Sequence, residues 1–343
     1  MIGTYGIIAV LLVIAELIYF KIADKCNIID KPNERSSHST IVLRGGGIIF
    51  AISILVWMGL QMVQGEWFMV KDYLPFVVGL VLICGISFWD DVKSLPDSLR
   101  MAVQIISILL MFWSMGLYTA ADSWLWTAVI VVVALFFCVG ATNFINFMDG
   151  INGITAAYSF AMLLPILLMN RGLGFIEESY LIVAILGVIV FSIFNFRPKG
   201  KAKCFAGDVG SIGIAFILLF ALGRLMLATQ DVTYIVFFLI YGVDGTLTII
   251  HRIMLHENLG EAHRKHAYQL MANELGMSHV VVSLLYMCIQ LAVSLGFIYL
   301  CPNTILAHWI YLVVVGIVLA LSYILFMRKY YCLHEQYLKS LEK

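Results

Sequence analysis

Two adjacent aspartates, Asp90 and Asp91, stand where an uncharged apolar run (residues 73–89) ends, and Lys93 follows them. Neighbouring carboxylates repel each other and raise each other's pKa, so such a pair needs a cation, water or a chemical task. The run before them is of a length typical of a membrane-spanning helix. The pair therefore predicts a charged site at the edge of a membrane.

A second polar stretch, "NFINFMDGING", carries Asn143, Asn146 and Asp149 at intervals of three residues. On a helical turn these three side chains share one face. Amide and carboxylate oxygens suit a hard cation such as Mg²⁺, which usually keeps water ligands and shares a substrate phosphate. The alternative is a helix start capped by Asn or Asp, without a catalytic role.

A third stretch, "KCFAGDVGSIG", places Asp208 between two glycines at the start of an apolar run. An acid and small residues at a helix N-terminus can bind a metal and present backbone N–H groups to phosphate. The basic residues before it are typical of contact with anionic lipid, and for the lysines we favour that role over substrate binding. They are Arg197, Lys199, Lys201 and Lys203.

A fourth stretch, "AHRKHAYQL", contains His263, Arg264, Lys265 and His266 in consecutive positions. Arginine binds phosphate oxygens bidentately and neutral histidines donate hydrogen bonds, so the cluster suits a pyrophosphate group. A metal site is the weaker interpretation here, because hard oxygen ligands occur elsewhere in the chain. A plain surface loop of basic residues is the alternative.

The first polar loop adds Asp30, Arg44 and the glycines at 45–47, which permit close approach to a phosphate. It also contains Asn33, Arg35 and His38.

Asp244 lies inside an apolar run, where an ionisable group is by default a candidate functional residue. Pairing with His251 or Arg252 is an equal alternative.

Composition defines the protein class. The 343 residues are 62% hydrophobic and 12% charged, and the mean hydropathy is +0.98; soluble domains are about 25% charged. The formal net charge is zero, which gives no basic footprint for nucleic acid. The seven cysteines include no CxxC pair, so neither a disulfide framework nor a zinc site is expected. The chain is predicted to be a polytopic membrane protein.

Eleven apolar runs position the polar stretches, and we expect an all-α protein with a single membrane domain over residues 1–343. The first run lacks a basic n-region and a cleavage site, so we count it as a span. The runs lie near 2–22, 45–64, 73–89, 99–117, 124–142, 153–170, 179–196, 209–228, 233–251, 279–300 and 305–327.

Loop charge predicts the orientation of these spans. With residue 1 outside, Lys71 and Arg171 are the only basic residues in the outer gaps, Arg224 lies within a span, and the other eighteen of twenty-one Lys and Arg are inside. All of the polar stretches then fall on the cytoplasmic side. Carboxylates there would hold Mg²⁺, Mg²⁺ would hold phosphates, and basic groups would neutralise the rest. The pattern predicts phosphoryl chemistry between a soluble phosphorylated donor and a lipid acceptor.

Together, "DKPNERSSH…RGGG", "DDVKSLP", "NFINFMDGING", "FAGDVGS" and "HRKHAYQ" resemble, in that order, the motifs of the polyprenyl-phosphate N-acetylhexosamine-1-phosphate transferase family. This family includes the phospho-MurNAc-pentapeptide translocase and the enzymes that initiate O-antigen, teichoic acid and capsule assembly. The resemblance implies transfer of a sugar 1-phosphate from a UDP-amino sugar to undecaprenyl phosphate, with release of UMP. It also implies eleven spans in a bacterial inner membrane, an active site on the cytoplasmic face, and dependence on Mg²⁺ or Mn²⁺. The assembly is left open, with a homodimer as one option.

The resemblance also assigns roles to individual residues. Asp90 and Asp91 would lie beside the phosphates, with Asp90 as the candidate base toward the lipid phosphate and Lys93 as a phosphate partner. Asn146 and Asp208 match metal-binding positions.

Further roles follow from the same resemblance. Asp149 belongs to the nucleotide and metal site and is counted with the catalytic residues. The other candidates for substrate binding are Arg44, Asn143, His263, Arg264 and His266.

Three departures from the family pattern bear on the substrate. Asn152 replaces a common aspartate, arginine and lysine enter the histidine cluster, and Leu43 replaces a proline. The variant cluster resembles the branch that starts O-antigen or capsule units, often with unusual or 6-deoxy amino sugars. Together the departures argue against a muramoyl-pentapeptide substrate.

We expect direct in-line attack by the lipid phosphate on the donor's β-phosphorus. The alternative is a two-step route through a phosphorylated Asp91. Two functions of other classes compete with the enzyme: a transporter or flippase for a polyprenyl-linked sugar, and a catalytically silent scaffold for polysaccharide assembly. The transporter would need polar groups inside the membrane, for which only Glu16, Arg224 and Asp244 qualify.

Overall fold

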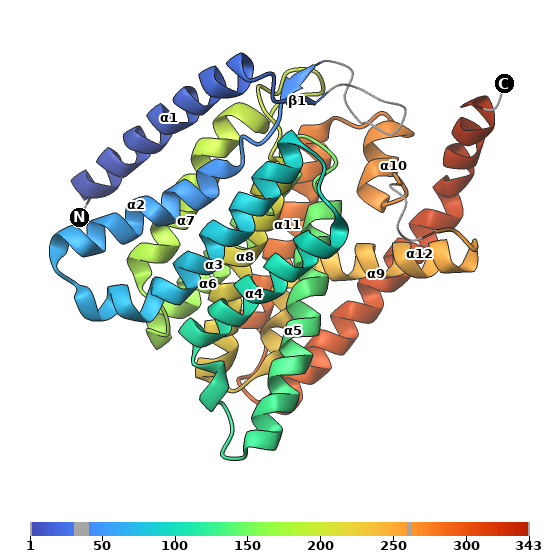
Figure 1. Ribbon diagram of the computed structural model, residues 1–343. Helices are drawn as coiled ribbons and strands as arrows, with labels where there is room; N and C mark the ends of the chain where they lie inside the picture. The colour runs from blue at the N-terminus through green and yellow to red at the C-terminus, as the bar shows by residue number, and fades with distance from the viewer. Residues whose placement is uncertain (1, 31–40, 259–262, 342–343) are drawn as a thin grey trace.

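The computed structural model describes residues 2–30, 41–258 and 263–341. Asn33, Arg35 and His38 of the first polar loop lie outside these residues. The described chain forms a bundle of helices in which the polar loops gather at one end, at the top of Figure 1. The N-terminal and C-terminal helices, α1 and α12, lie on opposite sides of the bundle.

The elements follow one another as a helical series with one small hairpin. The α-helices are α1 (Ile2–Lys25), α2 (Ile48–Gln64), α3 (Trp67–Val92), α4 (Asp97–Met115), α5 (Trp124–Phe147), α6 (Ile154–Leu173), α7 (Glu178–Asn195), α8 (Gly207–Thr229), α9 (Leu239–Met254), α10 (Ala267–Asn273), α11 (His279–Tyr299) and α12 (Ile305–Leu341). Two 3₁₀ segments are η1 (Leu117–Thr119) and η2 (Val232–Phe238). Strands β1 (Ile29–Asp30) and β2 (Val42–Leu43) pair antiparallel.

The prediction of an all-α polytopic membrane protein is confirmed. Among the described residues, ten helices are long and apolar enough to cross a membrane. The remaining predicted run, at 45–64, is helix α2, which has 17 residues and is apolar but shorter than the others. All eleven predicted runs are therefore helical.

Three features differ from the predicted spans. The run at 233–251 begins as the 3₁₀ segment η2 before α9, and α9 runs across the bundle rather than along it (Figure 1). Helix α12 continues to Leu341, well past the expected end at residue 327. The loop at 252–278 contains the unpredicted helix α10. Hydropathy marks apolar runs, but it does not mark a helix that ends in polar residues.

Helix α8 runs through the middle of the bundle, and nearly every residue from Val209 to Leu222 is buried. A helix that is apolar on all sides is expected to be buried in this way. Phe76 of α3 stacks on Phe216 and Phe220 of α8, with ring centroids 5.4 and 4.1 Å apart. This packing holds α3 against α8, and the polar stretches lie at the end of α3 and the start of α8.

The glycines after Arg44 let the first polar loop reach the start of α8. The N–H of Gly46 donates to the carbonyl of Phe205 at 2.8 Å, and the N–H of Gly47 donates to that of Ala206 at 3.1 Å. A Cβ on Gly47 would lie 2.4 Å from the Cα of Gly210, so any larger residue would push α2 and α8 apart. The close approach places Arg44 beside the N-terminus of α8.

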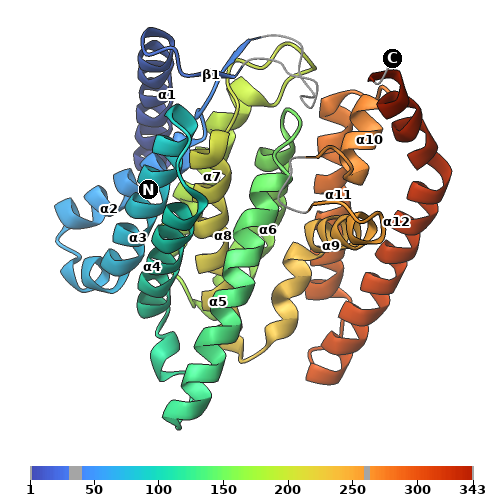
Figure 2. The same ribbon diagram turned by 45° about the vertical axis from the view of Figure 1, so that its right-hand side comes forward.

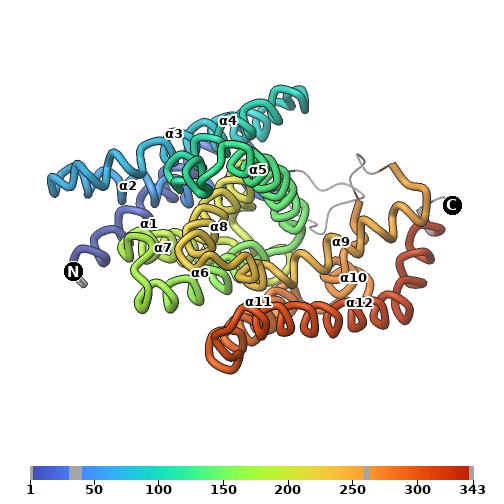
Figure 3. The backbone as a smooth tube through the Cα atoms, turned by 90° about the horizontal axis from the view of Figure 1, so that it is seen from below, coloured from blue at the N-terminus to red at the C-terminus, as the bar shows by residue number. Residues whose placement is uncertain are grey.

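Helices α9 to α12 form a second part of the bundle. Seen from below, α12 lies along the outer edge of the molecule, with α9 and α10 between it and the rest (Figure 3). The view of Figure 2 shows α12 rising past α9 to reach α10. Buried Ala267 and Leu270 of α10 pack against Tyr323 and Met327 of α12. The upper half of α12 is thus fixed against the fourth polar stretch.

Candidate active site

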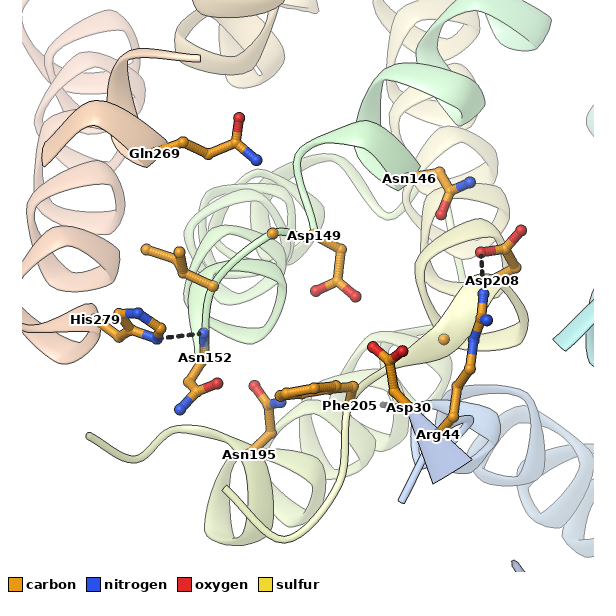
Figure 4. A pocket seen from close by; sticks show the side chains of 13 residues that line it. Asp30, Arg44, Asn146, Asp149, Asn152, Asn195, Phe205, Asp208, Gln269 and His279 are labelled. Carbon is orange, nitrogen blue, oxygen red and sulfur yellow. Dashed lines mark hydrogen bonds and ion pairs between the residues drawn. The ribbon is translucent and has the colours of Figure 1, made fainter. Parts of the chain in front are cut away.

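A polar cavity of about 300 Å³ opens where the polar loops meet. Figure 4 shows Asp149 reaching into it, with Asp208 and Arg44 on one side and Asn152 and His279 on the other. Four of the five motifs contribute side chains to its wall, and the remaining motif, "DDVKSLP", binds Arg44. The lining residues are Asp30, Arg44, Asn146, Asp149, Gly150, Ile151, Asn152, Asn195, Phe205, Gly207, Asp208, Gln269 and His279.

Asp91 joins the end of α3 to the start of α8. Its carboxylate accepts hydrogen bonds from the backbone N–H groups of Asp208 and Val209, each at 3.0 Å. Its Oδ1 also lies 2.7 Å from Nε of Arg44, and the side chain has no exposed surface. An acid at a helix N-terminus satisfies unpaired N–H groups and complements the helix dipole. Asp91 therefore orients Arg44 and the first turn of α8, and does not line the cavity itself.

Asp90 is bound by the neighbouring loop and helix. Its Oδ1 accepts the N–H of Leu95 at 2.7 Å, and its Oδ2 lies 2.6 Å from Nη1 of Arg100. The same Arg100 nitrogen lies 3.5 Å from Oδ2 of Asp208, and Arg100 also pairs with Asp97. Asp90 thus directs Arg100 toward Asp208. Arg100 was not among the residues picked out in the sequence.

Asp208 is the acid that the two arginines share. Nη2 of Arg44 lies 3.4 Å from its Oδ1, and its side chain is 18% exposed. Asn146 is on the facing helix, where its Oδ1 accepts a hydrogen bond of 2.6 Å from Oγ of Ser211, one turn into α8. Asp149 accepts a hydrogen bond of 2.5 Å from Thr155. All three oxygen-bearing side chains line the same cavity.

Burial raises the pKa of Asp149 to about 7, and the hydrogen bond from Thr155 only partly offsets this shift. An unfolded chain ionises aspartate near pH 4. Between about pH 4 and 7 the native protein therefore keeps a proton that the unfolded chain has lost, and the free energy of unfolding falls as pH rises through this window. We expect Asp149→Asn to reduce that fall, measured as the apparent melting temperature in EDTA at pH 5 and pH 7.5. Exposed Asp97→Asn is the control; an unchanged fall in Asp149→Asn contradicts the assignment.

Asn152, Asn195, Gln269 and His279 form the neutral part of the cavity wall, and the last three were missed in the sequence. Nδ1 of His279 accepts the backbone N–H of Asn152 at 3.2 Å. Asn195 accepts the N–H of Gly153 at 2.7 Å and donates to the carbonyl of Cys204 at 2.8 Å. Asn195 and His279 lie at the very ends of apolar helices, where a single polar residue gives no motif.

Some predicted site residues do not line the cavity. Lys93 is exposed, and Asn143 donates to the carbonyl of Val139 at 2.8 Å, one turn back in its own helix. His263 lies beside His266, with ring centroids 5.0 Å apart. Burial and the nearby His266 lower the pKa of His263 to about 3, so its ring is neutral.

The two basic residues of the same loop bind carboxylates instead. Nη2 of Arg264 lies 2.9 Å from Oε1 of Glu274, and Nζ of Lys265 pairs with Glu257. The loop reaches the cavity through Gln269. Binding roles for Lys93, Asn143, His263, Arg264 and His266 stay predictions.

Asp244 has a structural partner set of its own. It accepts hydrogen bonds from the N–H of Ala267 at 3.2 Å and from Tyr286 at 2.5 Å, and Nδ1 of His266 lies 3.2 Å away. It thus anchors the fourth polar stretch.

The other two polar groups that a transporter would need are also engaged. Arg224 pairs with Asp72 at 3.0 Å, and Oε1 of buried Glu16 accepts from the Cys204 thiol at 3.6 Å. None of these three groups lines the polar cavity.

The donor set of the cavity suits a hard cation that arrives with a phosphate. Three carboxylates line it (Asp30, Asp149 and Asp208), and the amide of Asn146 lies with Asp149 and Asp208. Among the described residues, no group of three or more His, Cys, Asp or Glu side chains is placed to hold a metal. Mg²⁺ rarely uses an all-protein site and is usually held by one or two carboxylates together with water and substrate phosphates. The residues therefore fit a magnesium ion shared with a diphosphate.

An apolar groove of about 630 Å³ runs between α5 and α9 beside this cavity. Phe144 lines the groove, and Asn146, two residues further along α5, lines the polar cavity. The wall of the apolar groove is almost entirely hydrocarbon and aromatic: Val133, Phe136, Phe137, Gly140, Ala141, Phe144, Ile235, Phe238, Leu239, Gly242, Val243, Thr246, Leu247 and Ala320. A polar site and an apolar groove thus lie at the end of one helix.

Comparison with known proteins gives a consistent set of relatives. Residues 73–226 match the model of glycosyl transferase family 4. The chain is 28% identical, over 313 residues, to the probable undecaprenyl-phosphate N-acetylglucosaminyl 1-phosphate transferase of Bacillus subtilis, a match that covers 87% of this chain and 84% of the relative.

Phospho-N-acetylmuramoyl-pentapeptide-transferases match over shorter segments. That of Thermotoga petrophila is 28% identical over 197 residues, which are 53% of this chain and 62% of that protein. That of Thermotoga maritima is 32% identical over 120 residues, which are 35% and 37% of the two chains. The family match at residues 73–226 contains the residues that line the polar cavity from the end of α5 to the start of α8. The resemblance indicated by the sequence motifs is confirmed: the chain is similar to glycosyl transferase family 4 over residues 73–226 and to the transferases named above.

Proposed function

We propose that this protein transfers an N-acetylated amino-sugar 1-phosphate from a UDP-sugar to undecaprenyl phosphate, releasing UMP. The observation that carries the proposal is the pairing of the acidic and basic cavity with the apolar groove along α5. A polyprenyl chain would lie in the groove and present its phosphate at the end of α5. The UDP-sugar would enter the cavity from the aqueous side. The Bacillus subtilis relative is named as a probable undecaprenyl-phosphate N-acetylglucosaminyl 1-phosphate transferase, which supports the acceptor and the transferred group.

In the proposed reaction, an oxygen of the lipid phosphate attacks the β-phosphorus of the donor. A new P–O bond forms, the bond between the two donor phosphates breaks, and UMP leaves with the electron pair. A phosphate monoester has a second pKa near 6, so most of the acceptor is already ionised at neutral pH. The attack therefore needs little help from a general base. A general base is the role that the sequence predicted for Asp90.

Each polar residue has a proposed part in this step. Arg44 binds and orients the diphosphate, while Arg100 balances the charge of Asp208. Mg²⁺, held by Asp208, Asn146 and Asp149, would neutralise charge on the phosphates when bound. Asp90 and Asp91 would position the two arginines, each through a direct ion pair. Because both oxygens of Asp91 are engaged and its side chain is inaccessible, the two-step route through a phosphorylated Asp91 is disfavoured.

We also propose that the cavity faces the cytoplasm of a bacterium, in the inner membrane. The excess of Lys and Arg in the loops at this end supports that orientation. The neutral wall residue Asn152 and the variant "HRKHAYQ" loop favour a donor of the O-antigen or capsule branch over a muramoyl-pentapeptide donor.

The test is transfer by the purified protein in detergent to undecaprenyl phosphate, with a panel of UDP-amino sugars and with Mg²⁺ or EDTA. The expected result is UMP release and a lipid-pyrophosphate-sugar of matching mass, both abolished by EDTA. Product formation that survives EDTA would contradict the metal proposal alone. Absence of product from every donor, in protein shown to be folded, would contradict the transferase proposal and favour a transporter or scaffold.

A further inference from the structure

We propose that the upper end of α12, residues 328–339, is a positioning element for donor binding, and that it acts on the loop at 263–266 through Glu274 and His334. The loop at 263–266 is called the histidine loop below. The inference rests on the proposed function, since it assigns what fixes one wall of the donor site. Glu274 and His334 touch no substrate in this account.

Glu274 links α12 to the histidine loop. Its Oε1 lies 2.9 Å from Nη2 of Arg264 and 2.9 Å from Nδ1 of His334. The side chains of Glu274 and His334 are 4% and 1% exposed. Burial opposes ionisation of Glu274, but the hydrogen bonds from His334 and Arg264 outweigh it and hold its pKa below the ordinary value. A buried carboxylate paired in this way ties three separate segments to one point.

Aromatic side chains of α12 add a second contact. The guanidinium of Arg264 lies over the ring of Tyr337, 4.1 Å from its centroid. Nζ of Lys265 lies 6.0 Å from the ring centroid of Tyr331. Both distances are within the range of a cation–π interaction. The basic residues that distinguish this histidine loop therefore face α12 rather than the cavity.

Glu257 provides a further anchor from the segment after α9. Its Oε2 lies 3.1 Å from Nε of Arg252, and its Oε1 pairs with Lys265. At the far end of the histidine loop, Asp244 receives the backbone N–H of Ala267 at 3.2 Å. Three carboxylates thus hold the histidine loop from Arg264 to its junction with α10.

The consequence for the donor site follows through α10. His266 begins this helix with a reciprocal hydrogen-bonded cap to Gln269, and Gln269 lines the cavity. The side chain of Gln269 also lies close to Gly150: a Cβ added to Gly150 would be 2.8 Å from Nε2 of Gln269. Displacing the histidine loop therefore moves a wall residue of the cavity, while Asp149, which follows α5, and Asp208, on α8, stay in place. The contacts that join His334, Glu274 and the histidine loop are together called the tether. The affinity for the UDP-sugar should depend on the tether, whereas the rate of the chemical step should not.

The first test compares Glu274→Gln with Glu335→Gln, the same change at an exposed position of α12. For Glu274→Gln we expect the KM for the UDP-sugar to rise about tenfold, which corresponds to about 1.4 kcal/mol. We expect kcat and the KM for undecaprenyl phosphate to change by less than about threefold. Glu335→Gln should match the wild type in all three. An unchanged donor KM in Glu274→Gln would overturn the proposal.

His334 supplies a second pair of variants in case Glu274→Gln does not fold. Asparagine can place a donor nitrogen near the position of Nδ1, so His334→Asn should retain most of the donor affinity, whereas His334→Ala should raise the donor KM. Equal KM values in folded His334→Asn and His334→Ala would overturn the role of the hydrogen bond to Glu274. A fall in kcat with unchanged KM in His334→Ala would do the same.

Hydrogen exchange separates this inference from the proposed function. In the absence of substrate, amides of residues 263–270 should exchange faster in Glu274→Gln than in Glu335→Gln, with no change along α8. This readout needs no enzymatic activity. If the wild type shows no transfer but the exchange difference is found, the proposed function fails and the tether stands. If transfer is normal and exchange is equal in both variants, the tether fails alone.

Discussion

Asp208→Asn is expected to lower the transfer rate about a thousandfold while leaving the protein folded, because the change removes the charge on which two arginines and the proposed Mg²⁺ converge. Asp208 lies 3.4 Å from Arg44 and 3.5 Å from Arg100, and its carboxylate remains partly accessible from the cavity. Asparagine keeps the shape and the backbone hydrogen bonds to Asp91. The measurement is the initial rate of lipid-linked product at saturating donor.

Asp97→Asn is the matched control for this prediction. Asp97 also pairs with Arg100, but its side chain is 91% exposed and lies outside the cavity. Exposed ion pairs contribute about 0–1 kcal/mol, so the rate should stay within about threefold of the wild type. If Asp208→Asn and Asp97→Asn changed the transfer rate equally, the prediction would be contradicted, because Asp208 would then contribute no more than an exposed partner of Arg100.

Asp91→Ala is expected to have the largest effect on stability. The change leaves the N–H groups of Asp208 and Val209 without their acceptor and removes the ion pair to Arg44. Breaking a buried ion pair from one side costs about 3–5 kcal/mol. In detergent this should lower the apparent melting temperature by roughly 10 °C, and activity should fall together with the folded fraction.

The same residue discriminates between the two reaction routes. A donor labelled in its β-phosphate should leave no acid-labile phosphate on the wild-type protein when undecaprenyl phosphate is absent, because the Asp91 oxygens are occupied. A stoichiometric phosphoenzyme that is lost in Asp91→Asn would contradict this account. Full thermal stability of Asp91→Ala would contradict its role in joining α3 to α8.

Hydropathy predicted those parts of the fold that are determined by burial in the membrane. Each of the eleven apolar runs is helical, since a span must satisfy its backbone hydrogen bonds internally. Hydropathy did not predict the 3₁₀ segment before α9, because an apolar run has the same hydropathy whether it forms a 3₁₀-helix or an α-helix. It also missed the upper part of α12, where helix is favoured by contacts such as that between His334 and Glu274.

The candidate site was predicted where several polar residues share a short segment. Arg44, Asn146, Asp149 and Asp208 line one cavity, as expected from polar stretches that all fall on one predicted face of the membrane. Asn195, Gln269 and His279 were missed, because each is one polar residue at the edge of a helix.

Some residues of the motifs bind other side chains of the protein and do not line the cavity. Arg264 and Lys265 appeared as phosphate ligands in the sequence, but in the structure they bind Glu274 and Glu257. Which carboxylate a basic residue finds depends on tertiary packing, here the approach of α12 and of the segment after α9. One-dimensional spacing carries no information about that packing.

The most direct measurement of the central claim is the fate of the donor's β-phosphate. Undecaprenyl phosphate is incubated with the protein and a UDP-amino sugar labelled with ³²P at the β-position, and lipid and nucleotide products are separated. Transfer of a sugar 1-phosphate predicts that the label moves to the lipid and that one UMP appears for each labelled lipid. Label retained in UDP, with an unlabelled lipid-linked sugar, would show that the bare sugar is transferred and would contradict the account.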